Sequence, residues 1–136
     1  MSTQAERQVI SRLAVVEAIA QEMRSNPDVF YIGEDVGEAE GVFKQTQGLF
    51  EEFGDQRVID TPISEAGFVG VGVGAAFAGM RPVVEIMFGD FLTLIMDQLV
   101  NHAAKMNYLS LGGFQVSMVL RTAVGVGGVL GSTHSQ

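Results

Sequence analysis

Four segments of the sequence each follow a short apolar run and carry side chains of the kinds that take part in catalysis or cofactor binding. These side chains are Glu34 and Asp35, Asp60 and Glu65, Asp90 and Phe91, and Arg121 and His134. Carboxylates and imidazoles can act as general acids or bases, and aromatic rings pack against flat ligands. Taken singly, Asp60 and Asp90 suit helix caps. Phe91 suits a hydrophobic core, and His134, in a glycine-rich tail, suits the surface.

Glu65 differs from the other candidates because it stands in the first turn of an apolar helix. Phe68, Val69 and Val71 follow it. Burial among such neighbours would desolvate the carboxyl and favour its protonated form, whereas the positive end of the helix dipole would favour the anion. Glu65 is therefore a candidate catalytic group, and an ordinary acidic residue at a helix start is the alternative interpretation.

Apolar periodicity and turn residues predict alternating helices and strands along the chain. Helices are expected at residues 12–24, 44–53, 64–80 and 91–106, the last two capped by Ser64 and Asp90. Strands are expected at residues 29–32, 57–60, 83–87 and 115–120. The final helix has the clearest pattern, because its apolar residues share one stripe: Leu92, Ile95, Met96, Leu99, Ala103 and Met106.

This alternation predicts an α/β fold with three layers, in which a mostly parallel sheet carries helices on both faces. Ligands of such sheets bind beyond the carboxyl ends of the strands, where the four candidate segments fall. We expect a single domain without an internal boundary. Residues 122–136 turn glycine-rich without a further helix or strand to cover the last strand, so the domain is expected to be incomplete.

The predicted helix at 64–80 contains five glycines, each of which costs about 1 kcal/mol relative to alanine in a helix interior. Gly67, Gly70, Gly74 and Ala78 fall on one helix face. A face of small residues allows another backbone to approach closely. We therefore expect a buried helix that packs against a second helix or another subunit.

Composition excludes several classes of function. The 136 residues are 47% hydrophobic, enough for a core, and carry a net charge of −8 without a basic cluster that would bind nucleic acid. The chain has no cysteine, which excludes disulfides and thiolate chemistry. No apolar run approaches the ~20 residues of a membrane span, and the first residues do not resemble a signal peptide. We expect a soluble, cytoplasmic protein that binds neither nucleic acid nor membrane.

Two other motifs are rejected. The segment from Gly70 to Ala75 fits the dinucleotide pattern G-x-G-x-x-A, but that pattern needs a strand directly before its first glycine, and here the glycines lie inside a helix. His102 and His134 are far apart and neither has a second ligand at helical spacing, so no metal site is expected.

Several longer motifs resemble the beta subunit of the decarboxylating component of pyruvate, branched-chain 2-oxoacid or acetoin dehydrogenase complexes. Glu65 followed by Gly70 and Gly74 also resembles the pattern of pyrimidine-binding domains in thiamine-diphosphate enzymes. The resemblance runs from about residue 12 to the end, and the motifs that carry it are Ile32-Gly-Glu-Asp-Val-Gly37, Arg57-Val-Ile-Asp-Thr-Pro-Ile-Ser-Glu65, Gly79-Met-Arg-Pro82, Asp97-Gln98 with Asn101, Ala103-Ala-Lys105 and His134-Ser-Gln136.

This resemblance implies a role for three residues. Glu65 would hydrogen-bond N1′ of the aminopyrimidine of thiamine diphosphate, the contact that favours the tautomer able to take the C2 proton of the thiazolium. Phe91 would pack on the pyrimidine. His134 would lie near the substrate and the lipoyl acceptor.

The resemblance also implies a larger assembly. Residues 1–136 would be the N-terminal part of the pyrimidine-binding domain, with the remainder and a C-terminal domain missing. An alpha subunit would hold the diphosphate and its Mg²⁺ in an alpha2beta2 enzyme. That enzyme would decarboxylate a 2-oxoacid, or cleave acetoin, and pass the acyl group to a lipoyl-bearing acyltransferase. By itself the chain is expected to be inactive.

Two alternative functions stay open. Transketolase-like or deoxyxylulose-phosphate synthase-like carboligases share the pyrimidine-binding domain, and a short chain could also be a non-catalytic assembly module. One departure concerns the loop before His134: the family's proline and glycine after the arginine are replaced here by Thr122 and Ala123.

Overall fold

The computed structural model describes residues 8–125 and 131–134. Within them, four parallel strands form one sheet in the order β2-β1-β3-β4. The strands are β1 (Val29–Gly33), β2 (Val58–Asp60), β3 (Arg81–Phe88) and β4 (Val119–Ala123). The α/β fold class is confirmed, although β4 begins four residues later than the strand predicted at 115–120.

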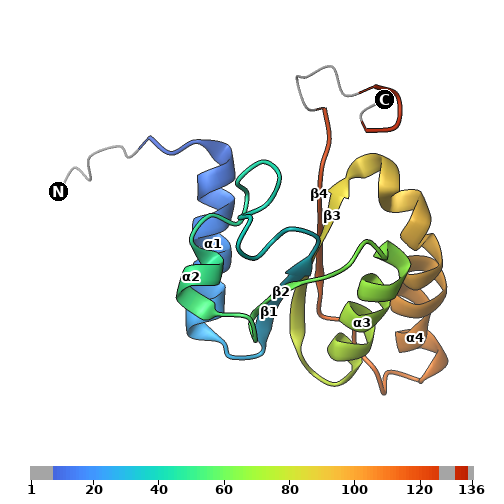
Figure 1. The fold of residues 1–136 in the computed structure, drawn as a ribbon. Coiled ribbons are helices and arrows are strands. Elements are labelled where there is room, and N and C mark those ends of the chain that lie inside the picture. The colour runs from blue at the N-terminus through green and yellow to red at the C-terminus, as the bar shows by residue number, and fades with distance from the viewer. Residues whose placement is uncertain (1–7, 126–130, 135–136) are drawn as a thin grey trace, which may run out of the picture.

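Helices cover both faces of the sheet and give the predicted three layers (Figure 1). One face carries α1 (Ser11–Ser25) and α2 (Leu49–Phe53). The other face carries α3 (Glu65–Phe77), the 3₁₀ helix η1 (Gly89–Ile95) and the π helix η2 (Gln98–Ala103), from which α4 (Ala104–Leu109) continues.

The central strand β1 is buried along its whole length, as expected of a parallel strand covered on both faces. Its side chains alternate between two cores. Val29 and Tyr31 pack against α1 and α2, whereas Phe30 and Ile32 pack against α3 and η1. The sheet is therefore held from both sides, and its carboxyl edge is fixed in place.

The second helix is shorter than predicted. Residues 44–48 form turns, and only Leu49–Phe53 is helical. Lys44 (φ 56°) and Gly48 (φ 80°) both take the left-handed backbone conformation, which an α-helix cannot include. The sequence pattern did not reveal these turns, because the side chains that fix them bond to distant parts of the chain.

The prediction that Asp90 caps a long regular helix is wrong. Asp90 lies inside η1, which already begins at Gly89, and its side chain makes no capping hydrogen bond. The segment then passes from a tight 3₁₀ turn to a wide π turn, so a constant period of 3.6 residues does not hold along it. Ile95 is fully buried, whereas Met96 from the same predicted stripe is 42% exposed.

The helix α3 begins after Ser64 as predicted, although the Ser64 hydroxyl donates to the Pro62 carbonyl (3.1 Å) rather than capping the helix. It ends at Phe77 instead of Met80. The glycine that allows close packing is Gly72, where a Cβ would lie 2.6 Å from Val84 Cγ2 of β3. Of the predicted small-residue face, Gly70 and Gly74 line a hollow together with Gln98 and His102 of η2, and a Cβ at Gly70 would lie 3.9 Å from Gln98 Cγ. Packing of this face against another subunit stays a prediction.

Replacing Gly72 with alanine is therefore expected to destabilise the fold. Overpacking typically costs about 1–3 kcal/mol, which exceeds the gain of about 1 kcal/mol in helix propensity. Gly74→Ala is the matched control on the same helix, because none of the described atoms lies within 4 Å of its Cβ position. Urea unfolding measures both variants. Equal stability of the two would contradict the close approach of α3 to β3.

Candidate active site

A cavity of about 390 Å³ opens at the carboxyl edge of the sheet. It is lined by residues that follow β1 and β2, begin α3, end β3, and belong to η1 and the C-terminal segment: Glu34, Asp35, Thr61, Pro62, Ile63, Glu65, Met87, Phe91 and His134. Parallel strands end at one edge, so the cavity has the position expected for a ligand site in an open α/β sheet.

The pairing of β1 with β2 explains how the two halves of this cavity meet. Gly33 pairs with Asp60, and the Thr61 amide donates to the Gly33 carbonyl at 2.9 Å. The next residues, Glu34 and Thr61, therefore leave the sheet side by side. Three further residues bring the chain to Glu65 at the first turn of α3.

Glu65 is buried, with 8% of its surface exposed. It is the one acidic residue in the first turn of α3, where the backbone amides stabilise negative charge. The structure thus places the carboxyl as predicted, at the start of an apolar helix and facing a cavity.

Glu34 is a second buried carboxyl in the same cavity, with 7% of its surface exposed. Burial raises the pKa of Glu34, the charge of Glu65 raises it further, and Asp35 adds a smaller effect in the same direction. The backbone amide of Ser64 opposes the shift. Among the described residues, Glu34 Oε1 and Thr61 Oγ1 are buried without a hydrogen-bond partner.

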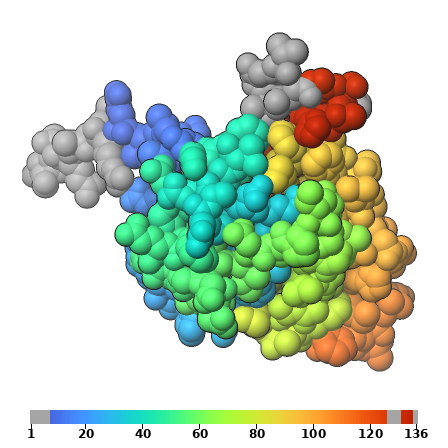
Figure 2. Space-filling model, viewed as in Figure 1, coloured from blue at the N-terminus to red at the C-terminus, as the bar shows by residue number. Residues whose placement is uncertain are grey.

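Aromatic rings form the opposite wall. Phe88, the last residue of β3, lies edge-on to Phe91 with ring centroids 5.7 Å apart. The imidazole of His134 lies edge-on to both rings, at 4.9 Å from Phe88 and 5.7 Å from Phe91. Figure 2 shows residues 131–134 (red) resting against the surface formed by η1 (yellow). This contact brings His134 to the cavity.

The structure thus brings together Glu65, Phe91 and His134, the three residues singled out from the sequence. Other candidates lie elsewhere. The Asp60 carboxylate accepts a hydrogen bond from the Gly37 amide (2.8 Å), Asp90 is part of η1, and Arg121 belongs to a separate buried cluster.

Glu34 was one of several carboxylates noted from the sequence but was not among the residues singled out. Its position directly after a buried strand and before a glycine-rich loop was the signal that could have identified it. Thr61 and Met87 also line the cavity and gave no signal, because their residue types are common at strand ends.

Two other kinds of site are absent from residues 8–125 and 131–134. These residues contain no group of three or more histidine or acidic side chains arranged to hold a metal ion. No helix in that part of the chain is long and apolar enough to cross a membrane. The segment from Gly70 to Ala75 lies inside α3, which confirms that it is not a dinucleotide-binding turn.

Sequence comparison places the chain in a family. The profile described as "Transketolase, pyrimidine binding domain" matches residues 7–136. The chain therefore belongs to the family of transketolase pyrimidine-binding domains. A solved structure titled "Split gene transketolase, inactive beta4 tetramer" has the same fold, with a TM-score of 0.60 and 18% identity, over 83% of this chain and 33% of that one.

Within this family, the chain is similar to beta subunits of the pyruvate dehydrogenase E1 component. It is 47% identical over 130 residues to the mitochondrial subunit beta-1 of Arabidopsis thaliana, covering 96% of this chain and 36% of that protein. It is 50% identical over 125 residues to the subunit of Rhizobium meliloti, covering 92% and 27%. The resemblance seen in the sequence motifs is confirmed. The chain spans roughly a third of the length of these relatives.

Replacing Glu34 with glutamine is expected to stabilise the fold at neutral pH. The pKa of Glu34 is raised in the folded state above the value of about 4.3 expected in the unfolded chain. At a pH above this value the carboxyl ionises more readily in the unfolded chain, which lowers the stability of the fold. Well below it the carboxyl is protonated in both states and has no such effect. The gain in melting temperature from Glu34→Gln should grow as the pH rises through that value and then level off. It should shrink in a Glu65→Gln background. A gain independent of pH would contradict this assignment.

Proposed function

We propose that the chain is the N-terminal part of the pyrimidine-binding domain of a beta subunit in a thiamine-diphosphate-dependent 2-oxoacid dehydrogenase. The observation that carries the proposal is the position of Glu65. Its buried carboxyl begins α3 and faces a cavity whose other wall holds Phe91 and His134. The similarity to pyruvate dehydrogenase beta subunits supports pyruvate or a related 2-oxoacid as substrate.

The cavity fits an aminopyrimidine. Such a ring is flat and carries both hydrogen-bond donors and acceptors at its edge. Phe91 offers an aromatic face, Glu65 offers a carboxyl, and the buried Glu34 Oε1 and Thr61 Oγ1 lack partners among the described residues. Buried polar atoms are normally hydrogen-bonded, so unpartnered ones beside a cavity favour a polar ligand there.

Each residue then has a distinct task. Bound thiamine diphosphate supplies a carbon nucleophile that attacks the carbonyl of a 2-oxoacid. Glu65 holds a proton at N1′ of the pyrimidine, and its burial keeps that hydrogen bond away from water. Phe91 orients the ring. His134 stands on the far wall, where it can hydrogen-bond the substrate or the acyl acceptor.

The charge of the cavity supports a site shared between two chains. Glu34, Asp35 and Glu65 place three carboxyl groups along its wall, and these would repel a diphosphate. This repulsion agrees with what the family resemblance implies: the diphosphate and its Mg²⁺ would be held by an alpha subunit, in an alpha2beta2 enzyme that works with a lipoyl-bearing acyltransferase. A cytoplasmic location stays a prediction, and the Arabidopsis relative carries the word mitochondrial in its name.

Glu65→Gln in the complete beta subunit, assembled with its alpha subunit, is expected to lower the rate of 2-oxoacid decarboxylation by about 10²–10⁴. Glutamine is nearly isosteric with glutamate, but its amide cannot accept and return the proton at N1′ of the pyrimidine as a carboxyl group can. Glu51→Gln is the matched control, because Glu51 also lies in the first turn of a helix but is exposed. Retention of most activity by Glu65→Gln would contradict the proposal. Sugar-phosphate transfer by the wild-type enzyme in place of lipoamide acylation would favour the carboligase alternative.

A further inference from the structure

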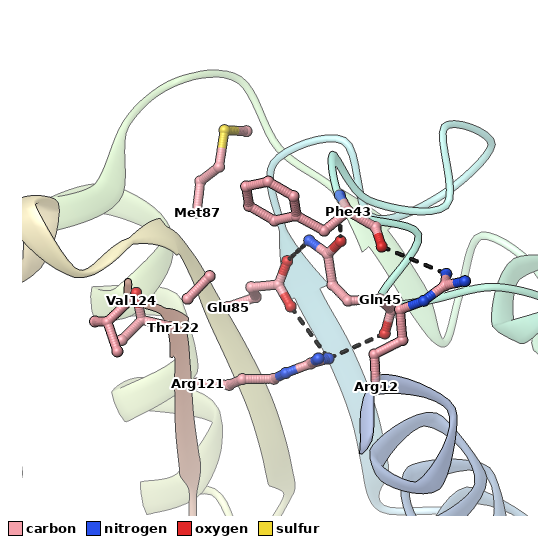
Figure 3. Close-up of a pocket in the computed structure, with 9 residues that line it drawn as sticks. Arg12, Phe43, Gln45, Glu85, Met87, Arg121, Thr122 and Val124 are labelled. Atoms are coloured by element: carbon pink, nitrogen blue, oxygen red, sulfur yellow. Dashed lines mark hydrogen bonds and ion pairs between the residues drawn. The ribbon is translucent and has the colours of Figure 1, made fainter. Parts of the chain in front are cut away.

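A second group of polar side chains, most of them buried, lies outside the candidate active site. It consists of Tyr31 on β1, Glu85 on β3, Arg121 on β4 and Gln45 in the loop before α2, and is referred to below as the Glu85 cluster. Figure 3 shows three of its members, Gln45, Glu85 and Arg121, which line a pocket of their own. Tyr31 is fully buried, Glu85 is 3% exposed and Gln45 is 6% exposed. None of these residues lines the candidate active site.

The partners of Glu85 come from three separate segments. The Tyr31 hydroxyl donates to Oε2, the Gln45 amide donates to Oε1, and Arg121 Nη1 lies 3.3 Å from Oε2. Burial raises the pKa of Tyr31, and the charge of Glu85 raises it further, so the phenol keeps the proton that it donates. Arg121 also donates to the Gln45 carbonyl at 3.0 Å.

Gln45 connects this cluster to the shape of its own loop. While its amide nitrogen binds Glu85, its Oε1 accepts a hydrogen bond from the Phe43 amide at 2.7 Å. The Gln45 side chain lies directly over Gly41, where a Cβ would approach its atoms to within 2.4–2.6 Å. On the other side of the loop, Arg12 of α1 donates to the Lys44 carbonyl at 3.0 Å. Residues 41–45 are thus held in one conformation by a buried side chain.

Phe43 carries this constraint to the candidate active site. Its ring lies edge-on to Phe88, with centroids 5.7 Å apart. Phe88 in turn contacts the imidazole of His134 at 4.9 Å. A continuous series of contacts therefore leads from Gln45 through two aromatic rings to His134. Edge-to-face aromatic pairs have a preferred geometry, so each ring favours one orientation of the next.

We propose that Gln45 is a positioning residue for His134. Through Phe43 and Phe88 it fixes the orientation in which the imidazole faces the cavity. The inference rests on the proposed function, in which His134 contacts the substrate or the acyl acceptor. Gln45 itself lies outside the candidate active site and contacts neither.

The kinetic test uses the complete beta subunit assembled with its alpha subunit. Gln45→Ala is expected to lower kcat by roughly tenfold, within the range that small misplacements of catalytic groups cause. The KM for the 2-oxoacid should change little. In a His134→Ala background the same replacement should cost no further activity, because the group that it positions is gone.

Tyr31→Phe is the matched control. It removes another neutral hydrogen bond of Glu85 but leaves the bonds between Gln45 and its loop in place. The kcat of Tyr31→Phe should fall by no more than about twofold. This should hold even if Tyr31→Phe and Gln45→Ala lower the melting temperature by the same amount. If the two variants lose activity equally, or if Gln45→Ala costs the same factor without His134, the role of Gln45 is structural and the proposal is overturned.

A second measurement does not depend on activity. The chain contains two histidines, His102 and His134, so histidine-selective ¹³C labelling of the assembled enzyme gives two imidazole signals per beta chain from these positions. His134 lies beside two aromatic rings and His102 lies on η2. Gln45→Ala and Phe43→Leu should both move the His134 signal and leave that of His102 unchanged. Phe43→Leu changes only a side chain that makes no hydrogen bond to the Glu85 cluster. A shift of the His134 signal in this variant therefore does not arise from disruption of that cluster.

The two measurements separate the possible failures. If the wild-type enzyme decarboxylates no 2-oxoacid, the proposed function fails, and the NMR signals still decide whether Gln45 orients His134. If the enzyme is active but the His134 signal stays in place in both variants, the proposed function stands and the positioning role is overturned.

Discussion

A buried carboxylate in the central part of the sheet constrains the rest of this structure. Glu85 is 3% exposed, and an unpaired charge at such a position would cost several kcal/mol. Its partners come from β1, from β4 and from the loop before α2, so the charge is compensated only when all three segments are in place. The sheet order and the conformation of residues 41–45 are therefore coupled through one side chain. The candidate active site is built on the edge that this coupling defines.

Much of the fold could be predicted because local patterns and the final structure agree. The apolar residues of α1, the buried run of β1 and the apolar residues of α3 each indicate an element that is present. Parallel strands then bring their carboxyl ends to one edge, which explains why Glu65, Phe91 and His134 could be expected to meet before any coordinates were known. The roles proposed for them rest on the family resemblance, because local physics alone allows Glu65 to be an ordinary acidic residue at a helix start.

The features that escaped prediction depend on contacts between residues far apart in the sequence. Gln45 and Glu85 are 40 positions apart, and Arg121 and Tyr31 are 90 apart. No local pattern signals such a cluster. The same holds for the turns at residues 44–48 and for the departure of residues 89–103 from a regular helix, where packing overrides the apolar period. The raised pKa of Glu34 likewise depends on its burial and then on the nearby charge of Glu65, both of which only the three-dimensional arrangement supplies.

The two groups of buried carboxyls differ in how their charge is compensated, and this difference suits their different tasks. Glu85 is balanced by Arg121 and two neutral hydrogen bonds, so it stabilises one arrangement of the sheet. Glu34 lines the same cavity as Glu65, whose charge raises the pKa of Glu34, and Glu34 keeps an unpartnered oxygen among the described residues. That arrangement costs folding free energy and leaves hydrogen-bonding capacity for a ligand. The charge of Glu85 is compensated by its partners, whereas the cavity keeps hydrogen-bonding groups without partners in the described part of the chain. A preorganised binding site requires this combination, because a rigid scaffold must hold the binding groups in place until the ligand arrives.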